Sequence, residues 1–292
     1  MNYKWILRQG SKKDVCPACG KRRFVPYVSA SDGQTPAGAE YGRCDRETSC
    51  GYFRYPSGVA PAETDPRKMP EPVRKPKLLI DPRVMYGDGV RDENTLLRAF
   101  SARLPRLKAT MDEYRCGTGV GGECIFYQFD GEHVRTAKAI MYGEYGHRLK
   151  GGDGQSLPVR WLHRMREEWR NDYELAQCLF GAHLLKKYPN RRVVVVEAEK
   201  TAVLMAAHQR NDGEEGDVFV ACGGSQMLKG KVDILPLIGR EVVLVPDDGQ
   251  YFNWKRTADT YGWKCIDISP IVPEGMAGAD IWDLIELEIL IN

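Results

Sequence analysis

The stretch VVVVEAEKTAV, from Val193 to Val203, predicts a β-strand that runs directly into a helix. Four consecutive β-branched residues are typical of a strand that is buried on both faces of a sheet. The segment EKTAVLMAAHQRN, which begins at Glu199, has a helical pattern. Glu197 lies between them at the end of the strand, where an unpaired buried carboxylate costs free energy. We therefore expect Glu197 to have a functional role.

The alternation of apolar strands and helices continues along the chain. Three further strands are predicted at DVFVACGG (217–224), REVVLVPDD (240–248) and WKCIDIS (263–269). Helical segments are predicted between them at MLKGKVDIL (227–235) and YFNWKRTADTY (251–261). Continuous apolar strands joined by helices are typical of a parallel sheet that is covered on both faces. The fold class predicted for residues 191–292 is therefore α/β, with a doubly wound parallel sheet.

Two more carboxylates, Asp247 and Asp248, stand at the end of a predicted strand of this sheet. Ligands gather at the carboxyl ends of the strands in such sheets. If this strand lies next to the one that ends at Glu197, three carboxylates converge and repel one another unless a cation enters. Oxygen ligands suit Mg²⁺ or Mn²⁺. We predict a magnesium site at Asp247 and Asp248 with Glu197 as the catalytic residue, whereas an acidic residue in a first helical turn, such as Glu199, is explained by the helix dipole alone.

The composition is that of a soluble globular protein. The chain has 292 residues, of which 42% are hydrophobic and 28% are charged. No apolar run is long enough to span a bilayer, and the first residues lack the apolar segment of a signal peptide. We therefore expect a cytoplasmic protein without a membrane partner. Nine cysteines in a reducing compartment favour a metal site and scattered buried thiols over a disulfide framework.

A proline-rich segment divides the chain. Residues 56–77 contain six prolines and few apolar residues, which predicts an extended linker. The linker separates a small module at 1–55 from a basic, mixed α+β region at 78–190. In that region the patterns predict helices at 92–104 and 173–187 and a β-hairpin at 123–142 that turns at Asp130-Gly131.

Four cysteines in the N-terminal module have the spacing of a zinc site. Cys16 and Cys19 form a Cys-x-x-Cys pair in CPACG, and Cys44 and Cys50 form a wider pair in RCDRETSCGY. No histidine precedes His133, so these thiols are the soft ligands of the module. A module of this size needs help to fold, which metal binding supplies. We predict a zinc ribbon with structural Zn²⁺; the alternative is a set of buried or redox-active thiols.

Charge is distributed unevenly along the chain. Residues 1–77 have fifteen Lys and Arg against eight Asp and Glu, and the remainder has a net charge of −5. Cations interleaved with aromatic residues are typical of proteins that bind single-stranded nucleic acid. The alternatives are a solvated basic surface and an aromatic core for the ribbon. The residues predicted to contact nucleic acid are Lys21, Arg22, Arg23, Arg43, Arg46, Arg135, Lys138, Arg148 and Lys150.

Several short motifs resemble the TOPRIM domain of bacterial-type primases, topoisomerases and some nucleases. They are VVVVEAEKTAV, the glycine pair after VFVAC and the later VLVPDD, and the resemblance covers 191–269. The order of zinc ribbon, basic region and TOPRIM domain is that of such primases. The phrases GRCDRETSCGY and QCLFGAHLL are similar to primase-like TOPRIM proteins encoded by Bacteroidetes and their mobile elements.

The resemblance implies roles for individual residues. Glu197 matches the glutamate that acts as general acid or base in nucleotidyl transfer, and Asp247 matches the first aspartate of the Asp-x-Asp motif that binds Mg²⁺. The second aspartate of that motif falls at Gly249, and Asp248 is one residue early, which turns its side chain toward the other face. Asp248, Glu199 and Asp280 are the candidates to replace the missing ligand, but none of them is in register.

The function implied by the resemblance is primer synthesis on single-stranded DNA with Mg²⁺ or Mn²⁺, in replication of a phage or mobile element. No phosphate-binding P-loop occurs in the chain, so a replicative helicase is expected as a separate partner. Two alternatives remain open. The first is a non-catalytic nucleic-acid-binding accessory protein with a degenerate metal site, and the second is a TOPRIM nuclease.

Overall fold

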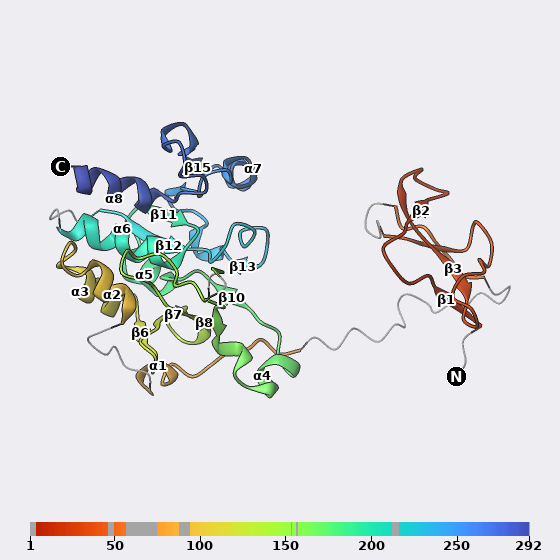
Figure 1. The fold of residues 1–292 in the computed structure, drawn as a ribbon, viewed down its shortest axis with the longest axis horizontal. Helices are drawn as coiled ribbons and strands as arrows, with labels where there is room; N and C mark the ends of the chain where they lie inside the picture. The colour runs from red at the N-terminus through yellow and green to blue at the C-terminus, as the bar shows by residue number, and fades with distance from the viewer. Residues whose placement is uncertain are drawn as a thin grey trace. The chain divides into compact units, whose positions relative to one another are not determined.

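The computed structural model describes residues 4–45, 50–56, 75–87, 94–152, 154–155, 157–211 and 216–291. These residues form two compact units, Met1–Val73 and Arg74–Asn292 (Figure 1). Most of the linker predicted at 56–77 lies outside the described residues, and so does Arg46.

Unit 1, Met1–Val73, is built on a small antiparallel sheet. Its strands are β1 (Trp5–Leu7), β2 (Asp14–Val15), β3 (Arg22–Ser29), β4 (Gly42–Cys44) and β5 (Phe53–Arg54). Their order is β1-β3-β4-β5, and β2 also pairs with β3. The core of this unit is small: Cys16, Phe24 and Cys44 form one buried cluster, and Val25, Tyr27 and Val28 of β3 are also buried. Tyr52 packs edge-on against Phe24 with the ring centroids 5.9 Å apart. Part of the aromatic content of this unit therefore serves its core.

The first half of unit 2, Arg74–Asn292, contains a four-stranded antiparallel sheet of order β6-β7-β8-β9. The strands are β6 (Cys116–Thr118), β7 (Cys124–Phe129), β8 (Val134–Ile140) and β9 (Arg160–Trp161). The helices of this half are α1 (Val84–Gly87), α2 (Thr95–Phe100), α3 (Leu107–Glu113), α4 (Glu167–Asn171), α5 (Ala182–Lys187) and the 3₁₀-helix Leu162–Arg164. The hairpin predicted at 123–142 is present as β7 and β8, which turn at Asp130-Gly131.

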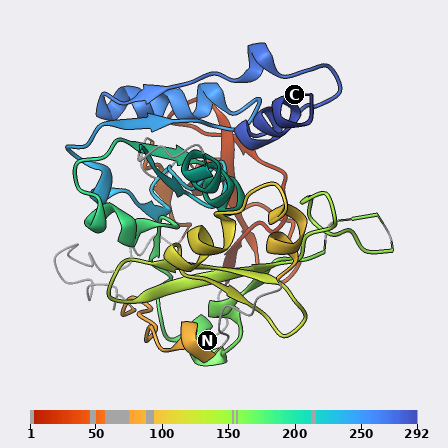
Figure 2. The same ribbon diagram turned by 90° about the vertical axis from the view of Figure 1, so that its left-hand side faces the viewer.

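The second half of unit 2 contains a four-stranded parallel sheet. Its strands, in spatial order, are β12 (Val218–Ala221), β11 (Val193–Val196), β14 (Val242–Leu244) and β15 (Lys264–Cys265). Its helices are α6 (Glu199–Asn211), α7 (Tyr251–Tyr261) and α8 (Ile281–Ile291), with 3₁₀-helices at Leu235–Leu237 and Ser269–Ile271. Helices α6 and α8 lie side by side in both views (Figures 1 and 2). The predicted parallel pairing of the strands is present, and β11 lies between β12 and β14.

The two halves of unit 2 share one hydrophobic core. Phe126 of β7 meets Phe180 edge-on at 5.5 Å, and Phe180 stacks on Tyr114 at 5.4 Å. The hydroxyl of Tyr114 donates a hydrogen bond of 2.7 Å to the carbonyl of Phe219 in β12. The boundary predicted at 190/191 lies within unit 2.

Three local predictions need correction. The helix predicted at 92–104 corresponds to the shorter helix α2, which begins after the N-cap Asn94 and ends at Phe100. The helix predicted at 173–187 is shorter, because Gly181 has a φ of +83° and α5 follows a short strand, β10 (Gln177–Cys178). The segment predicted as helical at 227–235 is a turn followed by β13 (Val232–Asp233), which pairs with β10. In the last two segments a glycine with positive φ interrupts the helical pattern.

Among the described residues, no helix has the length and apolar character needed to cross a membrane.

Candidate functional sites

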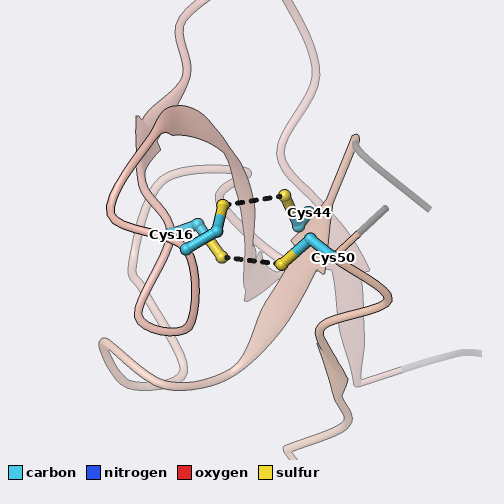
Figure 3. Close-up of side chains that lie close together, drawn as sticks. Cys16, Cys44 and Cys50 are labelled. Carbon is cyan, nitrogen blue, oxygen red and sulfur yellow. Dashed lines mark hydrogen bonds between the residues drawn. The ribbon is translucent and has the colours of Figure 1, made fainter. Parts of the chain in front are cut away.

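The four cysteines of unit 1 converge on one point. Cys16 and Cys19 flank the turn after β2, Cys44 ends β4, and Cys50 precedes β5. Their sulfur atoms all lie within 4.8 Å of one another, and the Sγ atoms of Cys16 and Cys50 are 3.8 Å apart (Figure 3). Tetrahedral zinc with Zn–S bonds of about 2.3 Å places its sulfurs at about this spacing. The predicted ligand set is therefore brought together.

The thiols also have the electrostatics of a metal site. The backbone N–H of Lys21 lowers the pKa of Cys19 to about 7. Although the N–H of Tyr52 lowers the pKa of Cys50, burial and the neighbouring thiols raise it to about 11. Adjacent thiolates repel one another, so a divalent cation is needed to hold all four in the ionised state. The cluster fits structural Zn²⁺.

Exposed cations lie next to this cluster. Lys21, Arg22 and Arg23 are exposed and line a surface depression together with Asp45. Asp45 pairs with Lys13 at 2.9 Å, so its charge is already compensated. The remaining predicted cation of the unit that the structure describes, Arg43, is half-buried in β4.

A second candidate site lies at the carboxyl edge of the parallel sheet in unit 2. Strands β11 and β14 are adjacent, with Val195 opposite Leu244. Glu197 follows Val195 by two residues and Asp247 follows Leu244 by three, so both carboxylates leave the same edge of the sheet. The Oε2 atom of Glu197 is buried and has no hydrogen-bond partner among the described residues. A buried carboxylate oxygen without a partner is suited to hold a proton or a cation.

Negative charge is in excess at this edge. The carboxylates that act on one another there are Glu197, Glu199, Asp247, Asp280 and Asp283. The cations among them are Lys138 and Lys200. Burial, followed by the charges of Glu197, Asp280 and Asp283, raises the pKa of Asp247 to about 8. Burial also raises the pKa of Glu197, although the Ser225 N–H and Lys138 oppose the rise. The edge therefore fits a cation, which would relieve this repulsion.

Each carboxylate considered as a replacement at position 249 is already engaged. Asp248 is at the surface, and its Oδ2 accepts a hydrogen bond from the Gly278 N–H at 3.0 Å. Glu199 is buried and pairs with Lys138 at 2.8 Å. Asp280 accepts hydrogen bonds from Thr201 and from the N–H of Asp283. Asp283 accepts a hydrogen bond from the N–H of Asp280 and lies 3.9 Å from Lys200. Of the described carboxylates at this edge, Glu197 and Asp247 therefore fit a metal best.

The four cysteines are, among the residues that the structure describes, the one group of three or more potential metal ligands whose donor atoms lie within 4.8 Å. This does not conflict with a magnesium site, because Mg²⁺ keeps several waters and binds through one or two carboxylates and substrate phosphates. Glu197 and Asp247 would supply those two carboxylates.

The four cations predicted for the middle region have different environments. Arg148 and Lys150 are exposed. Arg135 is half-buried and pairs with Asp130 at 2.7 Å. Lys138 is buried in β8, where its ammonium group pairs with Glu199, which differs from the surface role expected of it. This pairing could not be predicted from the sequence, because the two residues are 61 positions apart, Lys138 in strand β8 and Glu199 in helix α6.

The distant likenesses of this chain to solved structures include two that contain bacteriophage T7 primase domains. A crystal structure of the primase fragment of the bacteriophage T7 primase-helicase protein matches with a TM-score of 0.35 and 14% identity over 70% of this chain and 71% of that chain. A structure of the bacteriophage T7 lagging-strand DNA polymerase with primase domains, an RNA/DNA hybrid and dTTP matches with a TM-score of 0.34 and 13% identity over 63% of this chain and 83% of that chain. No curated protein matches the chain.

Two family models match the sequence. A model described as a zinc beta-ribbon finger covers residues 3–64 and includes all four cysteines. A second model covers residues 94–248, which is slightly more than half of the chain and includes the strand ends at Glu197 and Asp247. The chain therefore belongs to the family defined by this second model, the domain of unknown function DUF6371.

Proposed function

We propose that this chain is a primase-like TOPRIM protein that binds single-stranded DNA and makes primers with Mg²⁺ or Mn²⁺ in replication of a phage or mobile element. The observation that carries the proposal is the placement of Glu197 and Asp247 at the carboxyl ends of adjacent parallel strands, in an excess of negative charge. The order of zinc ribbon, basic region and acidic sheet edge supports it. A separate replicative helicase is the proposed partner.

We call the carboxyl edge of the parallel sheet, with its five carboxylates, the acidic edge. Glu197 and Asp247 would have different roles there. Asp247 would hold the divalent ion, because its raised pKa shows that its charge is poorly compensated by the protein. Glu197 has a pKa raised by burial and a free oxygen, so it is suited to take the proton of an attacking hydroxyl. When bound, the ion would neutralise triphosphate charge and help activate the attacking hydroxyl.

The basic residues would hold the single strand. Lys21, Arg22 and Arg23 are exposed beside the zinc cluster, where they would contact phosphates. Phe53 of β5 is 56% exposed, and its face would stack on an unpaired base. In unit 2, Arg148 and Lys150 would contact the phosphate backbone of the single strand.

A second candidate function is that of a non-catalytic accessory protein. It is favoured by Gly249, which has no side chain at the position of the second motif aspartate, and by the engagement of Asp248, Glu199 and Asp280 elsewhere. Such a protein would bind single-stranded DNA without needing a divalent ion.

The decisive experiment is primer synthesis on single-stranded DNA with ribonucleotides and Mg²⁺ or Mn²⁺. We expect product with the wild-type chain and a loss of at least about 100-fold in Glu197→Gln and Asp247→Asn, since proton transfer and metal binding each contribute at least that much. Asp259→Asn, at an exposed position of α7, is the matched control. DNA binding that is equal with and without Mg²⁺, with no primer made, would support the accessory function. Cleavage without synthesis would indicate a nuclease.

A further inference from the structure

Lys138 closes a ring of interactions around Glu197. The carbonyl of Glu197 accepts a hydrogen bond from the N–H of Gly223 at 2.8 Å. The carbonyl of Gly223 accepts one from Nζ of Lys138 at 2.7 Å. The same Nζ is 2.8 Å from Oε1 of Glu199, which follows Glu197 by two residues. The ring thus begins and ends on the segment 197–199, and Lys138 is its link.

The link comes from outside the parallel sheet. Lys138 lies on β8 of the antiparallel sheet, whereas Glu197 and Gly223 follow strands β11 and β12. The side chains of Lys138 and Glu199 are 7% and 3% exposed. Two charges at such depth cost free energy unless each is compensated by an opposite charge, so this pair is a specific arrangement and not a chance surface contact.

Described residues surround the ammonium group of Lys138 on three sides. It donates a hydrogen bond to the carbonyl of Gly223, and Oε1 of Glu199 lies 2.8 Å away as a charge partner that is not in hydrogen-bond geometry. The third side is covered by the indole of Trp161, whose ring centroid is 5.2 Å away. At Gly223, where φ is +85°, an added Cβ would lie 3.1 Å from Nζ of Lys138, so the turn is closely fitted to the ammonium.

We propose that Lys138 is a positioning residue of the acidic edge: it ties the Gly223 turn to the first turn of α6 and thereby fixes the place of Glu197. Only the catalytic role of Glu197 rests on the proposed function. The ring of interactions is present in the structure whatever the function is.

The test is hydrogen exchange of the Gly223 amide in the full chain, because that amide donates to the carbonyl of Glu197. In Lys138→Met we expect this amide to exchange with solvent at least about tenfold faster, because the hydrogen bond that holds the Gly223 carbonyl is lost. In the matched control Lys264→Met, at an exposed position of β15, we expect no change. Lys138→Arg keeps a charged donor and should restore part of the protection. Equal exchange of the Gly223 amide in wild type and Lys138→Met would overturn the proposal.

A second variant covers the case in which Lys138→Met alone does not fold. Lys138→Met/Glu199→Gln removes both charges and leaves neither one buried without its partner. We expect this variant to fold and the amide of Gly223 to exchange with solvent at least about tenfold faster, because its turn is no longer held. Unchanged protection of that amide would overturn the proposal. Neither measurement depends on primer synthesis, so a wild-type chain that makes no primer would refute the proposed function alone.

Discussion

Thr201 of α6 donates a hydrogen bond of 2.5 Å to Oδ2 of Asp280, the residue that precedes α8. The other oxygen of Asp280 accepts a hydrogen bond from the N–H of Asp283, and Asp283 accepts one from the N–H of Asp280, each at 3.0 Å. This reciprocal pattern is that of a capping box, which satisfies N–H groups at the start of a helix. Asp280 thus begins α8 and joins it to α6.

Replacing Asp280 by alanine should therefore lower stability. We expect Asp280→Ala to reduce the free energy of unfolding by about 1–2 kcal/mol, as for the loss of an N-cap. The measurement is urea denaturation of the full chain. Asp259→Ala removes an exposed pair with Lys255 and should change stability by less than about 0.5 kcal/mol. Equal effects of the two substitutions would show that the cap contributes nothing.

The raised pKa of Asp247 predicts a pH-dependent stability. In the native state Asp247 keeps its proton up to about pH 8, whereas the unfolded chain releases it near about pH 4. Between these values the native state binds more protons than the unfolded state, so its stability falls as pH rises. Asp247→Asn should remove this part of the slope. Urea denaturation of both proteins across that pH range gives the difference, and parallel curves would contradict the prediction.

The raised pKa of Asp247 also predicts that Mg²⁺ binding releases a proton. At neutral pH most Asp247 carboxyls are protonated, and a bound cation requires the ionised form. The affinity for Mg²⁺ should therefore rise with pH up to about 8. Calorimetry in two buffers of different ionisation enthalpy measures the proton release directly. If Mg²⁺ binds without releasing a proton, Asp247 is not its ligand.

The parts of the fold that sequence predicted best are those set by uninterrupted patterns. Val193–Val196 is apolar throughout, and such a strand must be covered on both faces. The hairpin at Asp130-Gly131 follows from alternation and a turn dipeptide. The four cysteines follow from spacing and from the absence of other soft ligands nearby. In each case the signal is local.

The parts that could not be predicted depend on contacts between distant residues. In VRTAKAI of β8 a lysine suggests a solvent-facing position, yet Lys138 is buried because Glu199 compensates its charge. The segment before Gly181 has a helical apolar pattern, but it pairs with β13 as a strand. Asp280 was considered only as a metal ligand, and its capping role was missed because the capping box is completed by aspartate and not by the usual glutamate or glutamine.

A substitution at Gly223 tests the close fit of the glycine turn. Gly223→Ala places a Cβ 3.1 Å from Nζ of Lys138 and 3.2 Å from Oε1 of Glu199, at a φ of +85°. We expect a loss of about 1–3 kcal/mol in the free energy of unfolding, because both the backbone conformation and the ion pair are disturbed. Gly262→Ala is the matched control, since φ is +70° there and the space is open. A loss no larger than that of the control would show that the ion pair accommodates the methyl group.

Loss of zinc should unfold unit 1 and spare unit 2. Cys16→Ser removes one of four ligands from a core in which the cysteines themselves are among the few buried side chains. Structural zinc supplies roughly 10–16 kcal/mol of apparent binding free energy in small modules, far more than this core provides. We expect the variant to lose its bound zinc, the dispersed amide NMR signals of unit 1 and much of its affinity for single-stranded DNA.

The signals of unit 2 provide the internal control for this experiment, because the two units have separate cores. Those signals and the thermal transition of unit 2 should be unchanged in Cys16→Ser. Cys265→Ser, at a half-buried thiol of β15, should leave the zinc content unchanged. Collapse of both units in Cys16→Ser would mean that the zinc cluster supports the whole chain, and full retention of zinc would mean that Cys16 is not a ligand.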